Sequence, residues 1–117
     1  MEYRFVGNTG MRVSRLAFGT MTFGGDADLD ASRALFHRCL DAGVDHFDTA
    51  DVYNGGRSEE ILGQLMHGAR DRLVIATKAY FPSGEGPNDR GSSRRHLVHA
   101  LEGSLRRLRT DRVELFY

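Results

Sequence analysis

The chain has 117 residues, of which 40% are hydrophobic and 27% are charged. These values are typical of one globular domain, residues 1–117, and exclude a disordered chain. Sixteen basic and sixteen acidic residues give a formal net charge of zero, so charge gives no indication of a nucleic acid or a membrane surface as partner. The single cysteine, Cys39, rules out an internal disulfide bond. With no signal peptide or long apolar run in view, we expect a cytoplasmic protein.

The N-terminal quarter of the sequence predicts short strands and one helix. Residues 2–6 and 11–14 predict a β-hairpin, because the Gly-Asn-Thr-Gly turn between them tolerates positive φ angles. Residues 16–19 predict a further strand, which leads into a glycine-rich loop. Asp28 or Asp30 is placed to cap the helix that follows.

The rest of the chain alternates between strands and helices. Further strands are predicted over residues 44–50, 73–77 and 113–117. Ser58 opens the second predicted helix, and Ser92 or Ser93 caps the third helix after a long loop. This alternation predicts an α/β fold with a parallel sheet and right-handed crossovers. A doubly wound sheet and a (β/α)8 barrel both fit the pattern.

The third predicted helix has an apolar stripe and a basic face. The stripe, expected to face the core, consists of Leu97, Val98, Leu101, Leu105 and Leu108. The arginines expected on a solvated face are Arg94, Arg95, Arg106, Arg107 and Arg109. Cys39 lies on the apolar stripe of the first helix and is expected in the core. No histidine has partners at metal-ligand spacing, so no metal site is predicted.

Asp48, Tyr53 and Lys78 are the residues most suggestive of chemistry. Asp48 and Lys78 each fall at the C-terminal end of a predicted strand, and Tyr53 lies in the loop after Asp48. The ends of neighbouring parallel strands lie about 4.8 Å apart, so an ammonium and a carboxylate there can pair beside a phenol. A nearby ammonium makes a phenol a stronger proton donor, which suits general acid catalysis toward an oxygen. From residue types alone, a structural ion pair beside a half-buried tyrosine is the more common outcome.

Five stretches of the sequence, in order, resemble the aldo/keto reductase superfamily and its bacterial members in particular. They are YRFVGNTGMRVSRLAFGTMTFGG, FDTADVYNGGRSEEILG, DRLVIATK, PNDRGSSRRHL and SLRRLRTDRVELFY. Together they cover essentially the whole chain. The resemblance implies a (β/α)8 TIM barrel and the NADPH-dependent reduction of aldehydes and ketones to alcohols.

Carried over to this sequence, the resemblance assigns roles to individual residues. Tyr53 would be the general acid, Lys78 would make it a stronger acid, and Asp48 would pair with Lys78. The expected cofactor-binding residues, beside the nicotinamide of NADPH, are Gly19, Thr20, Met21 and Asp48. Tyr80 matches a position that often lines the pocket for the carbonyl substrate, together with Tyr53.

The resemblance also limits what these 117 residues are expected to do. A complete barrel has eight strands, and only the N-terminal hairpin and four barrel strands are predicted here. The histidine that usually follows the fourth strand as a further catalytic residue is absent, as is most of the cofactor site. We therefore expect a truncated reductase with little or no activity, whose open sheet edges favour association with another chain. The alternative is a non-enzymatic regulatory module resembling a potassium-channel β subunit, or a gene remnant.

Overall fold

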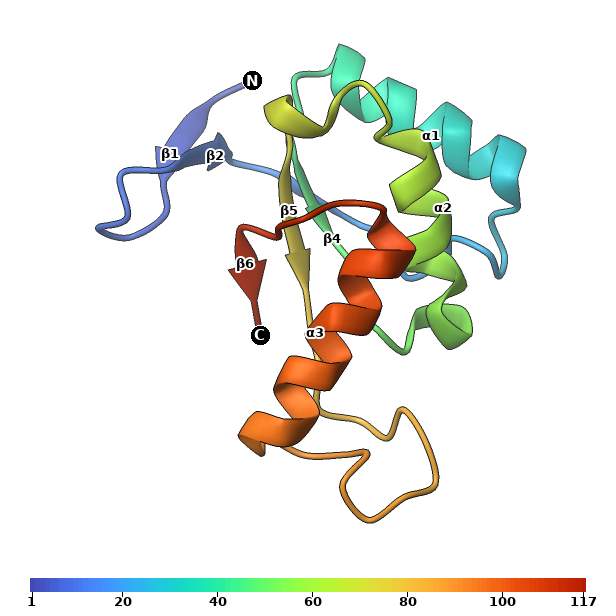
Figure 1. The fold of residues 1–117 in the computed structure, drawn as a ribbon. Coiled ribbons are helices and arrows are strands. Elements are labelled where there is room, and N and C mark those ends of the chain that lie inside the picture. Colours follow the sequence, from blue (N-terminus) through green and yellow to red (C-terminus); the bar gives the residue numbers. More distant parts are fainter.

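Four parallel strands form the centre of the computed structural model, which describes residues 1–117 (Figure 1). They lie in chain order as β3 (Ala17–Gly19), β4 (His46–Asp48), β5 (Val74–Thr77) and β6 (Leu115–Phe116). The helices that connect them are α1 (Leu29–Asp41), α2 (Arg57–Leu65) and α3 (Arg94–Leu108). Each step from one strand to its neighbour therefore passes through one helix, which confirms the predicted β-α-β alternation.

A separate two-stranded hairpin precedes the sheet (Figure 1). It consists of β1 (Tyr3–Phe5) and β2 (Arg12–Ser14), paired antiparallel as the sequence predicts. Its contacts are with the segment that enters β4. The backbone N–H of Ser14 donates to the carboxylate of Asp45 at 2.8 Å, and the hydroxyl of Tyr3 donates to the carbonyl of Gly43 at 2.9 Å. The hairpin thus caps the sheet at the N-terminal end of its strands.

The three helices cover one face of the sheet and enclose the main core. Phe47 of β4 and Ile75 of β5 are register partners, and both are fully buried. They belong to one cluster with Phe36 of α1, Leu62 of α2 and Leu108 of α3. Burial of a side chain of this size contributes about 1.5–3 kcal/mol, so this cluster is what holds the helices on the sheet.

Two helices begin at predicted caps. The carboxylate of Asp28 accepts a hydrogen bond of 2.9 Å from the backbone of Ala31, and α1 begins at the next residue after this cap. The hydroxyl of Ser93 accepts one of 3.1 Å from the backbone of His96 at the start of α3. Each side chain satisfies a backbone donor that the first turn of a helix leaves free.

The start of α2 differs from the prediction that Ser58 opens it. A short 3₁₀ turn, η1 (Tyr53–Gly56), comes first, and α2 begins at Arg57. Its cap is Gly56, whose φ of 92° lies in the left-handed region that favours glycine. Ser58 therefore lies within the first turn, and its hydroxyl contacts Thr20 and Thr49 instead of capping the helix.

Helix α3 packs on α2 through small residues, so the predicted leucine stripe is wrong as a description of its buried face. The residues buried on α3 are His96, Ala100, Gly103, Ser104 and Leu108. Of the predicted stripe, only Leu108 is buried, and Val98 is 42% exposed. The physical reason is the closeness of the two helices. A Cβ added at Gly63 of α2 would lie 2.6 Å from the carbonyl oxygen of Arg107.

The outer strands β3 and β6 each have one partner strand, so the sheet has two open edges. Ala17 of β3 and Phe116 of β6 are exposed there.

Between α2 and β5 the chain makes a second 3₁₀ turn, η2 (Arg70–Arg72). Cys39 of α1 is partly buried against the main cluster, and burial raises the pKa of its thiol. No helix of the structure combines the length and the apolar character needed to cross a membrane.

Candidate active site

The structure brings Asp48, Tyr53 and Lys78 together at the C-terminal edge of the sheet. Asp48 is the last residue of β4, and Lys78 directly follows β5, its parallel neighbour. The Nζ atom of Lys78 lies 2.5 Å from Oδ2 of Asp48 and 3.5 Å from the hydroxyl oxygen of Tyr53. Parallel pairing therefore turns a separation of 30 residues along the chain into direct contact.

The ammonium of Lys78 finds an acceptor for each of its three N–H donors. Besides Asp48 and Tyr53, the third acceptor is the backbone carbonyl of Thr49, at 2.8 Å. Because the oxygen of Tyr53 accepts from Lys78, the hydrogen of its own hydroxyl is free to donate to another group. The cluster can therefore donate a proton to an oxygen beside Tyr53, with the ammonium stabilising the negative charge left behind.

A cavity of about 250 Å³ opens beside this cluster. Tyr53 and Lys78 form part of its wall, and most of the remaining wall is apolar. Tyr80, for which the sequence suggests a place beside a substrate, lines this cavity. Sequence reasoning missed Phe81 and Tyr117, which also line it. The ring of Phe81 packs edge-on against Tyr80, with centroids 5.8 Å apart, so the two rings form one aromatic wall.

The predicted cofactor loop has two accessible residues and one buried residue. Gly19 and Met21 are exposed at the end of β3, next to Asp48, which is the register partner of Gly19. The side chain of Thr20 is fully buried, and its hydroxyl lies 3.2 Å from the carbonyl oxygen of Asp48. Thr20 thus fixes the end of β3 against β4, while Gly19 and Met21 are the residues of this loop that face outward.

The hydroxyl of Ser58 connects the ends of both strands to α2. It donates to the carbonyl of Thr20 at 2.7 Å, and it lies 2.8 Å from the hydroxyl of Thr20 and 3.2 Å from that of Thr49. All three side chains are fully buried. Thr49, which follows Asp48, and Thr20, which bonds to the carbonyl of Asp48 from the neighbouring strand end, are therefore held by hydrogen bonds that water cannot reach.

Asn54 joins the loop after β4 to the glycine-rich loop after β3. Its side-chain amide donates to the carbonyls of Met21 and Phe23, at 2.8 and 2.9 Å. Its backbone has a φ of 50°, a left-handed conformation that asparagine tolerates better than most residues. Sequence reasoning missed this connection, since only the tertiary structure places the two loops side by side.

A buried acidic group lies behind the loop that carries Tyr53. Glu59 of α2 is fully buried, and its carboxylate accepts hydrogen bonds of 2.6 Å from Thr77 of β5 and from Arg107 of α3. The expectation that Arg107 belongs to a solvated face is therefore wrong. A carboxylate this deeply buried requires a cation, and Arg107 is the arginine that the packing of α3 on α2 brings to it.

Asp51 is a second buried carboxylate of this region that the sequence did not single out. It is 8% exposed, and neither of its carboxylate oxygens has a hydrogen-bond partner. Burial raises the pKa of this carboxyl group, and the negative charge of Glu59 raises it further, against the opposing effects of Arg107, the Val52 backbone and His96. Unlike Asp48, it has no cation in hydrogen-bonding contact.

Comparison with known proteins agrees with this geometry. The model of the Aldo/keto reductase family matches residues 15–117. A probable voltage-gated potassium channel subunit beta from Oryza sativa subsp. japonica is 46% identical over 121 residues, covering 100% of this chain and 37% of that protein. Uncharacterized oxidoreductase YrpG from Bacillus subtilis (strain 168) is 45% identical over 127 residues, covering 99% of this chain and 39% of that protein. The solved structure of aldo-keto reductase AKR11C1 from Bacillus halodurans (holo form) superposes with a TM-score of 0.86 and 33% identity, covering 99% of this chain and 39% of that one.

The fold is thus that of an incomplete (β/α)8 TIM barrel, with a Lys–Asp–Tyr cluster at the carboxyl ends of its strands. The chain belongs to the aldo/keto reductase family. It spans less than two fifths of the length of the relatives that it matches.

Proposed function

We propose that these residues contribute the proton-donating part of the active site of a reductase that converts aldehydes or ketones to alcohols with NADPH. The observation that carries this proposal is the hydrogen bonding of Lys78 to Asp48, Thr49 and Tyr53 together. That arrangement fixes the ammonium and leaves the hydroxyl hydrogen of Tyr53 free. In this proposal Tyr53 is the general acid, Lys78 supports it, and Asp48 holds Lys78.

The exposed residues beside Asp48 fit the nicotinamide cofactor. A Cβ added at Gly19 would have no heavy atom within 4 Å, so the backbone there is open to close approach by a ligand. Gly19, Met21 and Asp48 would hold the cofactor on this side, with Thr20 fixing the loop. The bound NADPH would supply a hydride to the carbonyl carbon of the substrate.

The cavity beside Tyr53 favours a substrate with an apolar substituent. Its aromatic wall, Tyr80 and Phe81, can stack on or surround an apolar group while the carbonyl oxygen accepts the proton of Tyr53. We therefore propose an aromatic or branched aliphatic aldehyde as the preferred carbonyl substrate class.

On their own, the 117 residues should have little activity. The sheet of four strands leaves the site open on the sides of β3 and β6, and catalytic groups give large rate factors only when the whole constellation is held in place. We also propose that these open edges lead to self-association of the 117-residue chain, because unpaired strand edges readily pair with other chains.

A closed barrel that contains these residues tests the reductase proposal. Residues 1–117 replace the matching part of the Bacillus halodurans reductase, and oxidation of NADPH is followed with aromatic and aliphatic aldehydes. Removing a general acid lowers turnover by about 10²–10⁴-fold, so Tyr53→Phe should lower kcat to that extent with unchanged circular dichroism. Lys78→Met should have an effect of similar size, and the control Tyr3→Phe in the hairpin should have none. A folded, active chimera that Tyr53→Phe leaves unchanged would rule the proposal out.

A second candidate function is a regulatory subunit of a potassium channel. It rests on the 46% identity to the rice protein described as a probable channel subunit. The two candidates differ in what Tyr53→Phe changes. For a regulatory subunit, the substitution should leave assembly with channel protein intact, as measured by co-elution, and no aldehyde of the panel should be turned over.

A further inference from the structure

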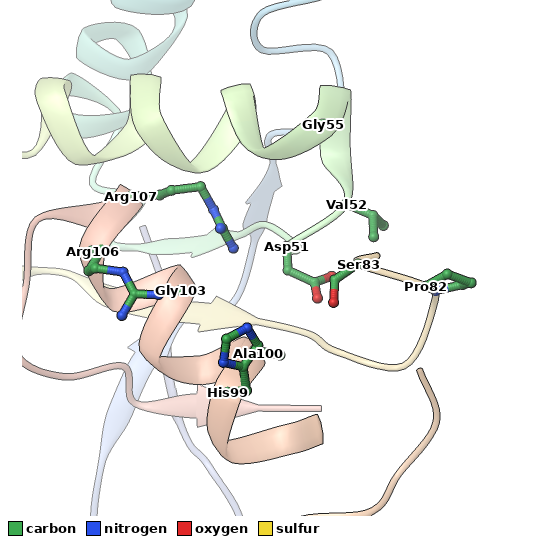
Figure 2. A pocket seen from close by; sticks show the side chains of 10 residues that line it. All are labelled: Asp51, Val52, Gly55, Pro82, Ser83, His99, Ala100, Gly103, Arg106 and Arg107. Carbon is green, nitrogen blue, oxygen red and sulfur yellow. The ribbon is translucent and has the colours of Figure 1, made fainter. Parts of the chain in front are cut away.

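A second cavity lies behind the loop that carries Tyr53, between residues 51–55 and α3 (Figure 2). Its volume is about 350 Å³, within the range of sites for small metabolites. Asp51 and Val52 line both this cavity and the one beside the catalytic cluster, whereas Tyr53 and Lys78 line only the latter. The loop after β4 is thus a wall between two separate cavities.

Hydrogen-bond donors surround the second cavity. Arg106, Arg107 and His99 face it from α3, and Ser83 faces it from the long loop after β5 (Figure 2). Arg107 uses its Nε on Glu59 and its Nη2 on Ser104, which leaves Nη1 available. The side chain of Arg106 makes no hydrogen bond or ion pair within the chain. Two guanidinium groups with free N–H donors are the usual partners of a phosphate or carboxylate.

Asp51 places one acceptor among these donors. Its side chain lines the same cavity as Ser83, and both of its carboxylate oxygens are buried without a partner (Figure 2). An ionised carboxylate can only accept hydrogen bonds. In its ionised form Asp51 would therefore repel a simple anion without a hydrogen-bond donor, whereas an anion that carries an O–H group could satisfy both Asp51 and the arginines.

We propose that this cavity binds a phosphate that carries an O–H donor, with the O–H donating to Asp51 and the phosphate oxygens accepting from Arg106, Arg107 and Ser83. Hydrogen phosphate has such a group on the phosphorus, and a phosphorylated polyol has one on its carbon chain. Sulfate has the same shape as phosphate and no O–H at neutral pH, so it lacks the donor that Asp51 requires. This site is separate from the reductase proposal and does not depend on it.

The test is a titration of the 117-residue chain at neutral pH in a phosphate-free buffer of constant ionic strength. The probes are inorganic phosphate, glycerol phosphate and sulfate, and binding is measured by calorimetry and by amide chemical shifts. We expect saturable binding of a phosphate probe near a Kd of about 1 mM, with shifts at Asp51, Ser83 and Gly103. Sulfate should bind at least about 10-fold more weakly. Tighter binding of glycerol phosphate than of inorganic phosphate would identify an organic phosphate as the ligand, and the reverse would identify the free ion.

Substitutions test the arginine donors and the Asp51 acceptor of the site separately. Arg106→Gln should weaken phosphate binding by about 10-fold, whereas Arg94→Gln, at the exposed start of the same helix, should leave it unchanged. Asp51→Asn adds N–H donors, so it should remove the discrimination between phosphate and sulfate. The proposal is overturned by equal binding of sulfate and phosphate to the unsubstituted chain, by no saturable binding up to about 20 mM, or by an unchanged affinity in Arg106→Gln.

Discussion

Glu59 of α2 and Arg107 of α3 are joined by a hydrogen bond of 2.6 Å between Oε2 and Nε, although 48 residues separate them in the chain. The other carboxylate oxygen of Glu59 accepts from Thr77 at the end of β5. Lys78, the next residue, carries the ammonium of the candidate active site. The contact between the two helices is therefore linked through one buried carboxylate to the strand that positions Lys78.

Removing the cation of this pair should be more harmful than removing both charges. In Arg107→Met the carboxylate of Glu59 stays buried without a cation, which costs about 3–5 kcal/mol of the free energy of unfolding. In the double variant Glu59→Gln/Arg107→Met no buried charge remains, so we expect a smaller loss. Urea unfolding of Arg107→Met, of Glu59→Gln and of the double variant measures this difference in the free energy of unfolding. Losses that simply add would show that the two side chains act independently.

The contact between α2 and α3 should not tolerate a methyl group at Gly63. A Cβ there would lie 2.6 Å from backbone atoms of Arg107 and Leu108, which cannot move without shifting the helix. Gly63→Ala should therefore lower the free energy of unfolding by about 3 kcal/mol. The matched control is Gly19→Ala, where a Cβ meets no heavy atom within 4 Å. Equal thermal stability of the two variants would contradict the close approach of the helices.

The role of Asn54 in holding two loops together can be separated from its backbone conformation. Asn54→Gly keeps the left-handed backbone accessible and removes the hydrogen bonds to Met21 and Phe23. Asn54→Ala removes the same bonds and adds backbone strain of about 1–2 kcal/mol. We expect both variants to speed amide hydrogen exchange in residues 19–27. Only Asn54→Ala should also lose free energy of unfolding through the strain of its left-handed backbone. Unchanged exchange in Asn54→Gly would show that the side chain does not hold the loop.

Asp51 should make the stability of the protein fall as the pH rises. Because burial and the charge of Glu59 raise the pKa of Asp51 in the folded protein, the folded state binds more protons than the unfolded state between the two pKa values. The contribution of this group to stability is therefore greatest below its unfolded pKa of about 3.9 and is lost as the pH rises through the folded pKa. Asp51→Asn should stabilise the protein at neutral pH, with the gain shrinking toward acidic pH.

The measurement is urea unfolding of Asp51→Asn and the unsubstituted chain across a pH series, in buffers without phosphate. Asp26→Asn serves as the control, because Asp26 is exposed and lies outside both cavities. A gain of the same size at every pH, or the same gain in the control, would mean that the ionisation of Asp51 is not responsible.

The open edges of the sheet should govern the association of the 117-residue chain. Lysine on an edge strand opposes pairing with another chain, so Ala17→Lys on β3 and Phe116→Lys on β6 should shift the chain toward a monomer. Light scattering after size-exclusion chromatography over a range of concentrations reports the change. Leu35→Lys, which removes an exposed apolar side chain from helix α1 and changes neither edge strand, is the control. An equal effect of all three variants would point to general hydrophobic association instead.

Much of the local structure and the meeting of the three candidate catalytic residues followed from the sequence. Asp28 and Ser93 cap their helices because a side-chain oxygen next to a free backbone N–H is a local interaction. Asp48 and Lys78 could be placed together because the carboxyl ends of neighbouring parallel strands always lie at one edge of a sheet. These inferences need only the order of the elements and the chemistry of single residues.

Only the tertiary structure decided which polar residues are buried. Leu97 and Leu101 have the spacing of a core face on α3. Gly63 of α2 nevertheless allows the two helices to approach so closely that the small residues of α3 form the contact. That same approach turns Arg107 inward to Glu59. Periodicity measures the hydrophobicity of a helix face and contains no information on the distance between two helices. The sequence by itself therefore determined the candidate reacting groups and their order along the chain. The packing distance between α2 and α3 decided that the charged side chains of Glu59 and Arg107 are buried behind them.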